Sequence, residues 1–291
     1  MSSTTTQYIS HSVGIDGLTK RGIPTRRHSP RPDGVLVQVN AASLDYRDME
    51  DMAGTILGIE TSVTKWKIGD RVLSTFVPAH KTGQLSEQAL SSSARAPAAC
   101  VTAWMAINGG RAIGQPGNGE VSIAGLLNCE GTGCKRYGWF IDLTLSRSKV
   151  FGSDFTVKYK ERAGWESYMM EVTNGHGADI ILETGGSRGL EKAFPCAAYG
   201  GLINCIGYTS GKTQAAGEQP NINFLTISRC LTLRGFVNVP TDRFEETVRY
   251  IEKNRIRPVN CMVLGLGEVK EAFKYLEAGS HSGKIVIRVE H

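Results

Sequence analysis

The chain has 291 residues, of which 41% are hydrophobic and 21% are charged, and its formal net charge is +5 at pH 7. This balance is typical of a globular protein whose core occupies one large domain or two. The charge is mild and no basic stripe is interleaved with aromatic residues, which argues against a nucleic-acid partner. No apolar run approaches the roughly 18 residues of a membrane span, and the N-terminus lacks the apolar core of a signal peptide. We therefore expect a cytoplasmic protein with no membrane partner.

The cysteines and histidines follow no known metal-binding spacing. The seven cysteines are scattered, and without a secretion signal we expect them to be reduced thiols. Cys129 and Cys134 form the one close pair, and no second pair matches it. The six histidines show no His-Glu-x-x-His or similar arrangement. The sequence therefore predicts no metal site.

The first third of the chain has the pattern of short strands separated by turns. Residues 34–43 alternate between apolar and polar side chains, and residues 53–59 and 70–77 are further β-rich runs. Such a series predicts a small β-barrel or sandwich. The small and polar residues of 90–99 have the composition of a domain boundary.

The middle of the chain alternates predicted strands with predicted helices. Strands are expected over 138–145, 180–182, 200–208 and 231–237, and helices over 163–172, 189–199 and 241–255. Parallel neighbours need long connections, so this alternation predicts a parallel sheet with crossover helices. An amphipathic segment and a last strand over 283–289 follow.

Glycine follows or ends three of these predicted strands, at Gly185 and Gly186, at Gly207 and at Gly235. Glycine ends many strands at tight turns. A single glycine exit, meaning a glycine where the chain leaves the end of a strand, would therefore not indicate a ligand site. In an open parallel sheet, however, ligands bind at the carboxyl ends of the strands, where glycine lets a backbone approach closely. Three exits on consecutive strands therefore predict a ligand crevice.

Several short motifs occur along the chain in the order of a known family. They are AASLDYRD, AGTILGIETSVTKWKIGDRV, VTAWMAI, NGHGADIILETGG, GGLINCIGYTSGK, LTLRGF, NRIRPV and YLEAGSHSGKIVIRV. As an ordered set, from about Gly17 to Val289, they resemble the zinc-free branch of the medium-chain dehydrogenase/reductase superfamily. This branch contains quinone oxidoreductases and NADPH-dependent alcohol or enone reductases. The Gly-His-Glu motif and the cysteine ligands of the zinc branch are missing from the sequence.

The resemblance implies an α/β fold of two domains. A β-rich GroES-like domain would comprise residues 1–96 and 256–291, and a Rossmann-type parallel sheet would comprise residues 97–255. NADPH would lie in the cleft and transfer hydride from C4 of its nicotinamide to the carbonyl, enone or quinone of a small-molecule substrate. The family carries longer segments after LDYRDME and after GQLSEQAL, so the GroES-like domain is expected to be incomplete.

The resemblance assigns most of the predicted site residues. Gly117 and Gly119 match the family's pyrophosphate turn, although Glu120 replaces a glycine and no apolar strand precedes the turn. Ser146, Arg147 and Lys149 supply hydroxyl and cationic groups where NADP-binding relatives hold the 2′-phosphate, although a solvated basic loop explains them equally well.

Tyr46 matches the tyrosine of the family's Asn-Tyr-Arg-Asp motif, which lies near the reacting carbonyl. Its phenol is the predicted catalytic group, as hydrogen-bond or proton donor to the developing oxyanion. Thr102 would line the nicotinamide side. The predicted cofactor contacts are therefore Thr102, Gly117, Gly119, Ser146, Arg147, Lys149, Gly185, Gly186 and Gly207.

Two further interpretations remain open at this point. The altered glycine turn and the shortened segments also fit a cofactor-free member of the lineage, which would serve as a binding protein or a non-redox catalyst. Internal losses beside intact flanks are also what a faulty coding sequence produces. Relatives often pair through the edge strand of the Rossmann sheet, so residues 230–239 are the candidate contact of a homodimer.

Overall fold

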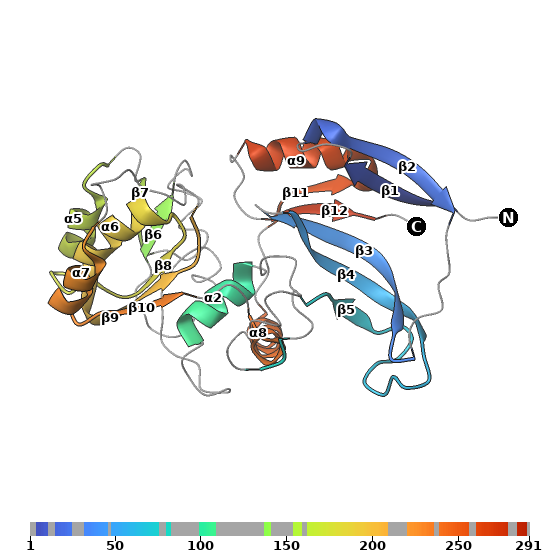
Figure 1. Cartoon of the computed structure of the whole chain (residues 1–291), viewed down its shortest axis with the longest axis horizontal. Coiled ribbons are helices and arrows are strands. Elements are labelled where there is room, and N and C mark those ends of the chain that lie inside the picture. Colours follow the sequence, from blue (N-terminus) through green and yellow to red (C-terminus); the bar gives the residue numbers. More distant parts are fainter. Residues whose placement is uncertain are drawn as a thin grey trace. The chain divides into compact units, whose positions relative to one another are not determined.

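The structure is a computed structural model that describes residues 4–10, 15–24, 32–45, 48–75, 80–82, 99–108, 137–140, 154–158, 162–208, 220–235, 239–255, 260–278 and 284–289. The chain forms two compact units, residues 1–75 with 258–291, and residues 76–257 (Figure 1). The sequence places the first boundary at 96/97 and the second at 255/256. Residues 80–82 belong to the second unit because the backbone N–H groups of Thr241 and Asp242 donate to the carbonyls of His80 and Lys81.

The first unit is built on a mixed five-stranded sheet in the order β11-β12-β3-β4-β5. Its strands are β3 (Val35–Asp45), β4 (Asp48–Ile59), β5 (Arg71–Leu73), β11 (Asn260–Gly265) and β12 (Lys284–Arg288). β12 runs antiparallel to β3, with Ile285 opposite Leu44 and Ile287 opposite Ala42. The C-terminal segment therefore completes the sheet of the N-terminal third, as the family resemblance implies.

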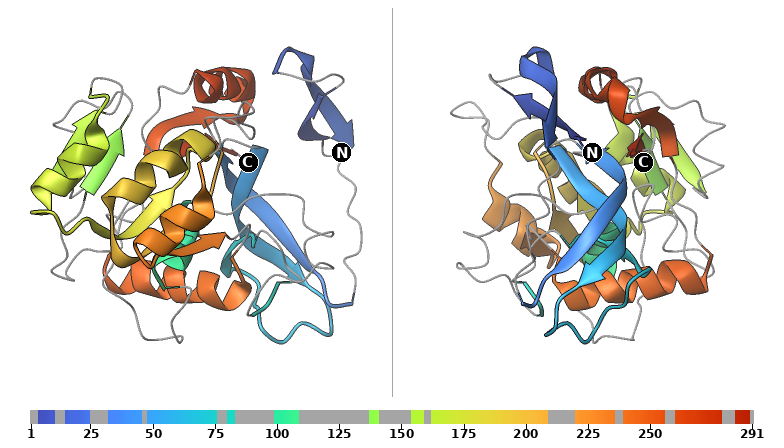
Figure 2. Two further views of the ribbon diagram at one scale, coloured as in Figure 1. Left: turned by 60° about the vertical axis from the view of Figure 1, so that its left-hand side comes forward. Right: turned by 90° about the vertical axis from the view of Figure 1, so that its right-hand side faces the viewer.

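One helix covers part of this sheet. It is α9 (Val269–Glu277), which follows a 3-10 turn, η2 (Leu266–Glu268), and lies beside β11 and β12 (Figures 1 and 2). One buried cluster of the unit consists of Leu44, Val269, Ala272, Ile285 and Ile287. A hairpin of β1 (Thr4–Ser10) and β2 (Leu18–Pro24), joined through η1 (Ile15–Gly17), precedes the sheet. The Tyr8 hydroxyl on β1 donates to the Gly267 carbonyl of η2.

The second unit contains the predicted parallel sheet. β8 (Ala178–Glu183), β9 (Ala197–Cys205) and β10 (Thr232–Gly235) run parallel in the order β10-β9-β8. The helices among the described residues of this unit are α2 (Ala99–Asn108), α5 (Trp165–Val172), α6 (Ser187–Cys196), α7 (Ile222–Ser228) and α8 (Thr241–Lys253). A separate parallel pair is formed by β6 (Tyr137–Phe140) and β7 (Phe155–Lys158).

The two faces of the parallel sheet have different partners. Ile181 and Ile203 belong to the main core together with Met169 of α5 and Phe194 of α6. Successive residues of a strand point to opposite faces, and Asn204, the next residue on β9, is linked to α2 through Arg234. Helices α5 and α6 therefore pack on one face of the sheet and α2 on the other, as a Rossmann-type layering requires.

Some elements differ from the sequence-based expectation. The helix predicted over 189–199 ends at Cys196, because Ala197 has an extended backbone and begins β9 opposite Ala178. Helix α7 and the β1–β2 hairpin are not predicted. β5 covers only the first half of the strand expected over 70–77. No helix in the described ranges has the length and apolarity that a membrane crossing requires.

Candidate functional site

The three parallel strands of the second unit end together. Glu183 on β8 lies opposite Cys205 on β9, and Cys205 lies opposite Gly235 on β10. The first two exits then continue side by side, since the Ile206 N–H donates to the Glu183 carbonyl over 2.8 Å. We call this group the strand-end edge: Glu183–Gly186 after β8, Ile206 and Gly207 after β9, and Gly235. It is the place where open α/β sheets bind ligands.

The Glu183 carboxylate lies within this edge and is only 7% exposed. Its Oε1 accepts from the N–H groups of Gly185 (2.7 Å) and Gly186 (3.1 Å), and its Oε2 accepts from Gly186 (3.0 Å). Burial raises the pKa of the Glu183 carboxyl above its ordinary value, and the two backbone donors oppose that rise. Burial also raises the pKa of the Cys205 thiol, and the charge of Glu183 adds to the effect.

The glycines of the edge differ in what surrounds them. Gly186 has a φ of 94° and a ψ of −147°, a conformation that is essentially restricted to glycine. A Cβ on Gly207 would lie 2.6 Å from the Thr184 carbonyl oxygen, so the close approach of the two exits requires glycine there. A Cβ on Gly235 would meet no atom within 4 Å. Two of the three predicted glycine exits are therefore explained by the chain's own packing.

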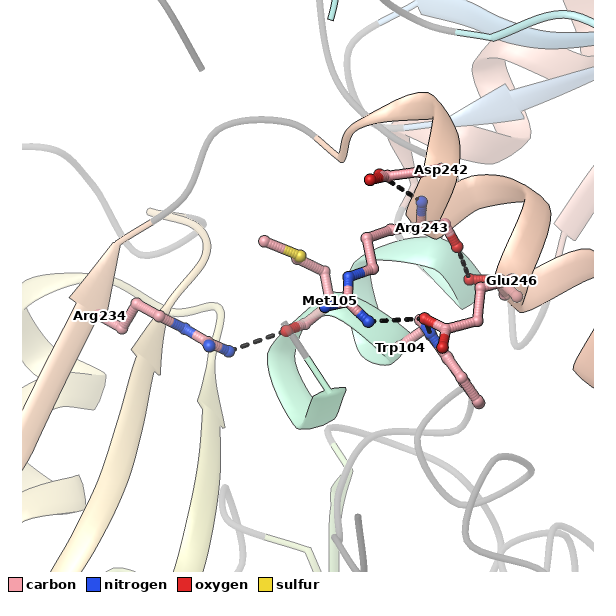
Figure 3. A network of polar contacts seen from close by, with 7 residues as sticks. Trp104, Met105, Arg234, Asp242, Arg243 and Glu246 are labelled. Atoms are coloured by element: carbon pink, nitrogen blue, oxygen red, sulfur yellow. Dashed lines mark hydrogen bonds and ion pairs between the residues drawn. The ribbon is translucent and has the colours of Figure 1, made fainter. Parts of the chain in front are cut away.

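Arg234 on β10 ties helix α2 to this part of the sheet. Its Nε and Nη2 donate to Oδ1 of the fully buried Asn204 at 3.0 and 2.7 Å. Nη2 also donates to the carbonyls of Met105 (2.8 Å) and Ala106 (2.6 Å), near the C-terminus of α2 (Figure 3). A cation is favourable at that end of a helix. Burial lowers the pKa of the Arg234 guanidinium.

A second network fixes the other side of α2. The indole N–H of Trp104 donates to Glu246 Oε2 on α8 over 2.9 Å, and Arg243 pairs with the same oxygen at 2.8 Å (Figure 3). The Trp104 ring also contacts Tyr250, with centroids 4.6 Å apart. Because Arg243 and Glu246 are buried and paired, α2 is held between α8 and the sheet by charged groups as well as by packing.

The strand-end edge brings together only part of the predicted site. Gly185, Gly186 and Gly207 lie on it, and half-buried Thr102 lies on α2, one turn before the carbonyls that Arg234 binds. The predictions for Tyr46, Gly117, Gly119, Ser146, Arg147 and Lys149 fall outside the described residues.

The motifs and spacings of the sequence do not single out Glu183, Asn204 or Arg234. Each of the three is a polar or charged residue within an otherwise apolar strand. Such a residue is rarely buried unless another group pairs with it, so its position alone indicates a buried contact.

Similarity to known proteins extends over the chain. Residues 151–287 match the family described as zinc-binding dehydrogenase. A zinc-type alcohol dehydrogenase-like protein of Schizosaccharomyces pombe is 26% identical over 321 residues, which cover 89% of this chain and 92% of that protein. The alignment is longer than the chain itself, so the relative has residues without a counterpart here. A highly reducing polyketide synthase of Glarea lozoyensis is 24% identical across 99% of this chain, which spans only 13% of the synthase.

Solved structures decide the fold. A putative alcohol dehydrogenase from Sinorhizobium meliloti superposes with a TM-score of 0.81 at 23% identity, over 99% of both chains. The chain has the medium-chain dehydrogenase/reductase fold. The CurK enoyl reductase also superposes, with a TM-score of 0.74 at 16% identity, over 98% of this chain and 99% of that one. The fold is therefore α/β, with a Rossmann-like parallel sheet and a β-rich N-terminal domain, as the sequence predicts.

The predicted cofactor is a nicotinamide dinucleotide, and two amide groups of the strand-end edge are already occupied. The N–H groups of Gly185 and Gly186, just before α6, already donate to Glu183. These two amides are therefore not available to a phosphate, and Gly117, Gly119 and the Ser146–Lys149 segment remain the prediction.

Zinc is the other group that members of this fold bind. Within the described ranges, no three His, Cys, Asp or Glu side chains gather into a possible metal centre. Zinc independence stays a prediction.

Proposed function

We propose that this protein is a zinc-independent, NADPH-dependent reductase that transfers hydride to a small carbonyl, enone or quinone. The observation that carries the proposal is the medium-chain dehydrogenase/reductase fold over nearly the whole chain, at a TM-score of 0.81. The names of similar proteins agree with it, since they include alcohol dehydrogenase-like and enoyl reductase proteins.

The strand-end edge supports the proposal in a second way. Its strands end in register, and the place of a Cβ on Gly235 is open. Arg234 and Glu246 hold α2, which carries Thr102, against the same unit of the fold. A nicotinamide ring must be held in a fixed orientation for hydride transfer. A rigid strand-end edge with space beside Gly235 would provide that orientation.

In this proposal the protein positions the reactants and supplies a proton. A bound nicotinamide would provide hydride chemistry at its C4. The substrate oxygen that becomes negative needs a hydrogen-bond donor, and we assign that role to the phenol of Tyr46. The guanidinium of Arg147 and the ammonium of Lys149 would pair with the 2′-phosphate, which favours NADPH over NADH.

A titration with NADPH tests the proposal directly. The purified protein is titrated with NADPH while quenching of tryptophan emission and enhancement of nicotinamide emission are followed. We expect saturable binding, and we expect Arg147→Glu to weaken it at least about tenfold, since a charge-assisted phosphate contact is lost and a repulsion is added.

The control for this titration is Arg249→Glu, because Arg249 is an exposed arginine on α8. It should leave the affinity unchanged. Absence of binding at millimolar NADPH, from protein that circular dichroism shows to be folded, would refute the proposal.

Two carboxylates favour a second candidate, a cofactor-free binding protein with the same fold. Glu183 occupies the amide groups of Gly185 and Gly186, just before α6, and Glu120 stands in the predicted pyrophosphate turn. Both carboxylates would repel phosphates at close range. The same titration distinguishes the two candidates, because the second predicts no saturation with NADPH or NADH.

We also propose that two copies of the chain associate through the second unit. β10 is the outer strand of the described β10-β9-β8 sheet, and Tyr199, Phe224 and Ile227 are 74%, 66% and 76% exposed. Large exposed apolar groups on elements next to an outer strand are typical of an interface. Light scattering should find a dimer, and Phe224→Asp with Ile227→Asp should convert it to a monomer.

A further inference from the structure

We propose that Glu183 is a positioning residue. Its carboxylate fixes the conformation of the turn between β8 and α6, and it prevents phosphate from binding to the amides of that turn. The proposal rests on the proposed function in one respect only, which is that this turn borders the cofactor-binding edge. The hydrogen bonds between Glu183 and the turn do not depend on whether a cofactor binds.

The Glu183 carboxylate binds both glycine amides of the turn. The turn consists of Thr184, Gly185 and Gly186, and the carboxylate accepts three hydrogen bonds from the last two. Gly186 is the N-cap residue of α6, and the N–H groups at a helix N-terminus attract anions. Here the anion comes from the strand that leads into the turn, and it binds the two amides that precede the first helical turn.

The glycines around Glu183 leave space for its carboxylate. A Cβ on Gly185 would lie 3.0 Å from Glu183 Oε1, and a Cβ on Gly189, in the first turn of α6, would collide with the same oxygen. Any side chain at Gly189 would therefore displace the carboxylate. Because Gly185 and Gly189 have no side chains, the carboxylate of Glu183 has room beside them.

The turn also changes the direction of the chain. Gly186 has a positive φ of 94°, which glycine adopts as readily as a negative one, so its contacts must select this direction. Glu183 binds the Gly186 N–H through both oxygens. The fork of the carboxylate therefore sets the direction in which the chain enters α6, and it acts on the cofactor-binding edge through Gly185 and Gly186 rather than by touching a ligand.

Two variants and one control test the role of Glu183. Glu183→Ala removes the anion, and Glu183→Gln keeps its size while replacing one acceptor oxygen with a donor. The control is Glu191→Ala, because Glu191 lies on the exposed side of the same helix. Hydrogen exchange at the Gly185 and Gly186 amides is measured with and without sodium formate, alongside NADPH affinity and melting temperature.

We expect the amides of the turn to exchange at least about tenfold faster in Glu183→Ala, because charge-assisted hydrogen bonds are lost. Formate should restore their protection in this variant, because the small carboxylate refills the empty place. The wild type and Glu191→Ala should not respond to formate. Glu183→Gln should lose protection without rescue, because its amide still fills the space.

Affinity for NADPH should fall in Glu183→Ala and recover with formate, which a loss of overall stability alone would not produce. Unchanged exchange in Glu183→Ala overturns the proposal, and so does protection of the wild-type turn by inorganic phosphate. If the wild type fails to bind NADPH, the proposed function fails, while the exchange and formate measurements still decide the role of Glu183.

Discussion

Replacement of Arg234 by methionine offers a direct test of how α2 is held. Methionine matches the apolar stem of arginine and keeps its packing, but it lacks the guanidinium and has no donor. The variant removes two bonds to Asn204 Oδ1 and two bonds to the carbonyls of Met105 and Ala106. Asn204 is fully buried, so its oxygen would be left without this partner.

The expected cost follows from these contacts. An acceptor left unsatisfied in the interior costs about 1–3 kcal/mol, and the loss of a cation at a helix C-terminus costs about 0.3–1 kcal/mol. Release of a buried guanidinium, whose pKa burial lowers, returns part of this. We therefore expect Arg234→Met to destabilise the second unit by about 1–3 kcal/mol.

The assay combines urea unfolding with hydrogen exchange of α2. Far-UV circular dichroism gives the free energy of unfolding, and exchange of the Ala99–Asn108 amides shows whether the helix itself opens more often. Arg249→Met is the matched control, because Arg249 is exposed and only weakly paired with Glu245 at 3.8 Å. This control should change the free energy of unfolding by less than about 0.5 kcal/mol.

A double-mutant cycle makes the test sharper. Asn204→Leu combined with Arg234→Met removes both polar partners, so no orphaned oxygen remains. The double variant should therefore be more stable than the sum of the single costs by about 1–3 kcal/mol. Strictly additive costs, or a single Arg234→Met cost below about 0.5 kcal/mol, would refute the reasoning.

Three other variants test separate parts of the molecule. Tyr46→Phe should lower kcat at least about tenfold and leave NADPH affinity unchanged, whereas the control Tyr199→Phe should match the wild type in both; full turnover would show that the Tyr46 phenol is not needed. Phe194→Ala should reduce the free energy of unfolding by about 3–5 kcal/mol in urea denaturation, because Phe194 is fully buried in the main core; a cost below about 1 kcal/mol would contradict that packing. Glu183→Gln should lower the raised pKa of the Cys205 thiol, so alkylation of Cys205, mapped by mass spectrometry, should begin at lower pH while the exposed Cys230 is unaffected; an unchanged profile would mean that the carboxylate does not act on the thiol.

The fold was predictable because its patterns are local. Alternation of apolar strands with amphipathic segments predicts parallel β8, β9 and β10, and the charge distribution of residues 241–255 predicts α8. The helix–strand boundary at Cys196 was not predictable from the helical period. That boundary depends on the pairing of Ala197 with Ala178 on a neighbouring strand, which is tertiary information.

The candidate site was less accessible to sequence reasoning. The glycines after β8 and β9 suit an approaching ligand as well as they suit the chain's own packing, and sequence alone does not separate the two. The structure separates them through Glu183 and the Thr184 carbonyl, which occupy the space beside Gly185 and Gly207. Arg234 illustrates the same limit, because its partners lie on α2, far away in the chain.

The pairing of β12 with β3 has a consequence for the order of events during synthesis. Leu44 leaves the ribosome long before its partner Ile285, because the two residues lie far apart in the chain. The second unit, residues 76–257, is complete before that partner exists. Strand β3 must therefore wait, with its apolar residues uncovered, until β12 has been made. A nascent chain whose synthesis stops before β12 would keep these apolar residues exposed, and chaperones would have to protect it.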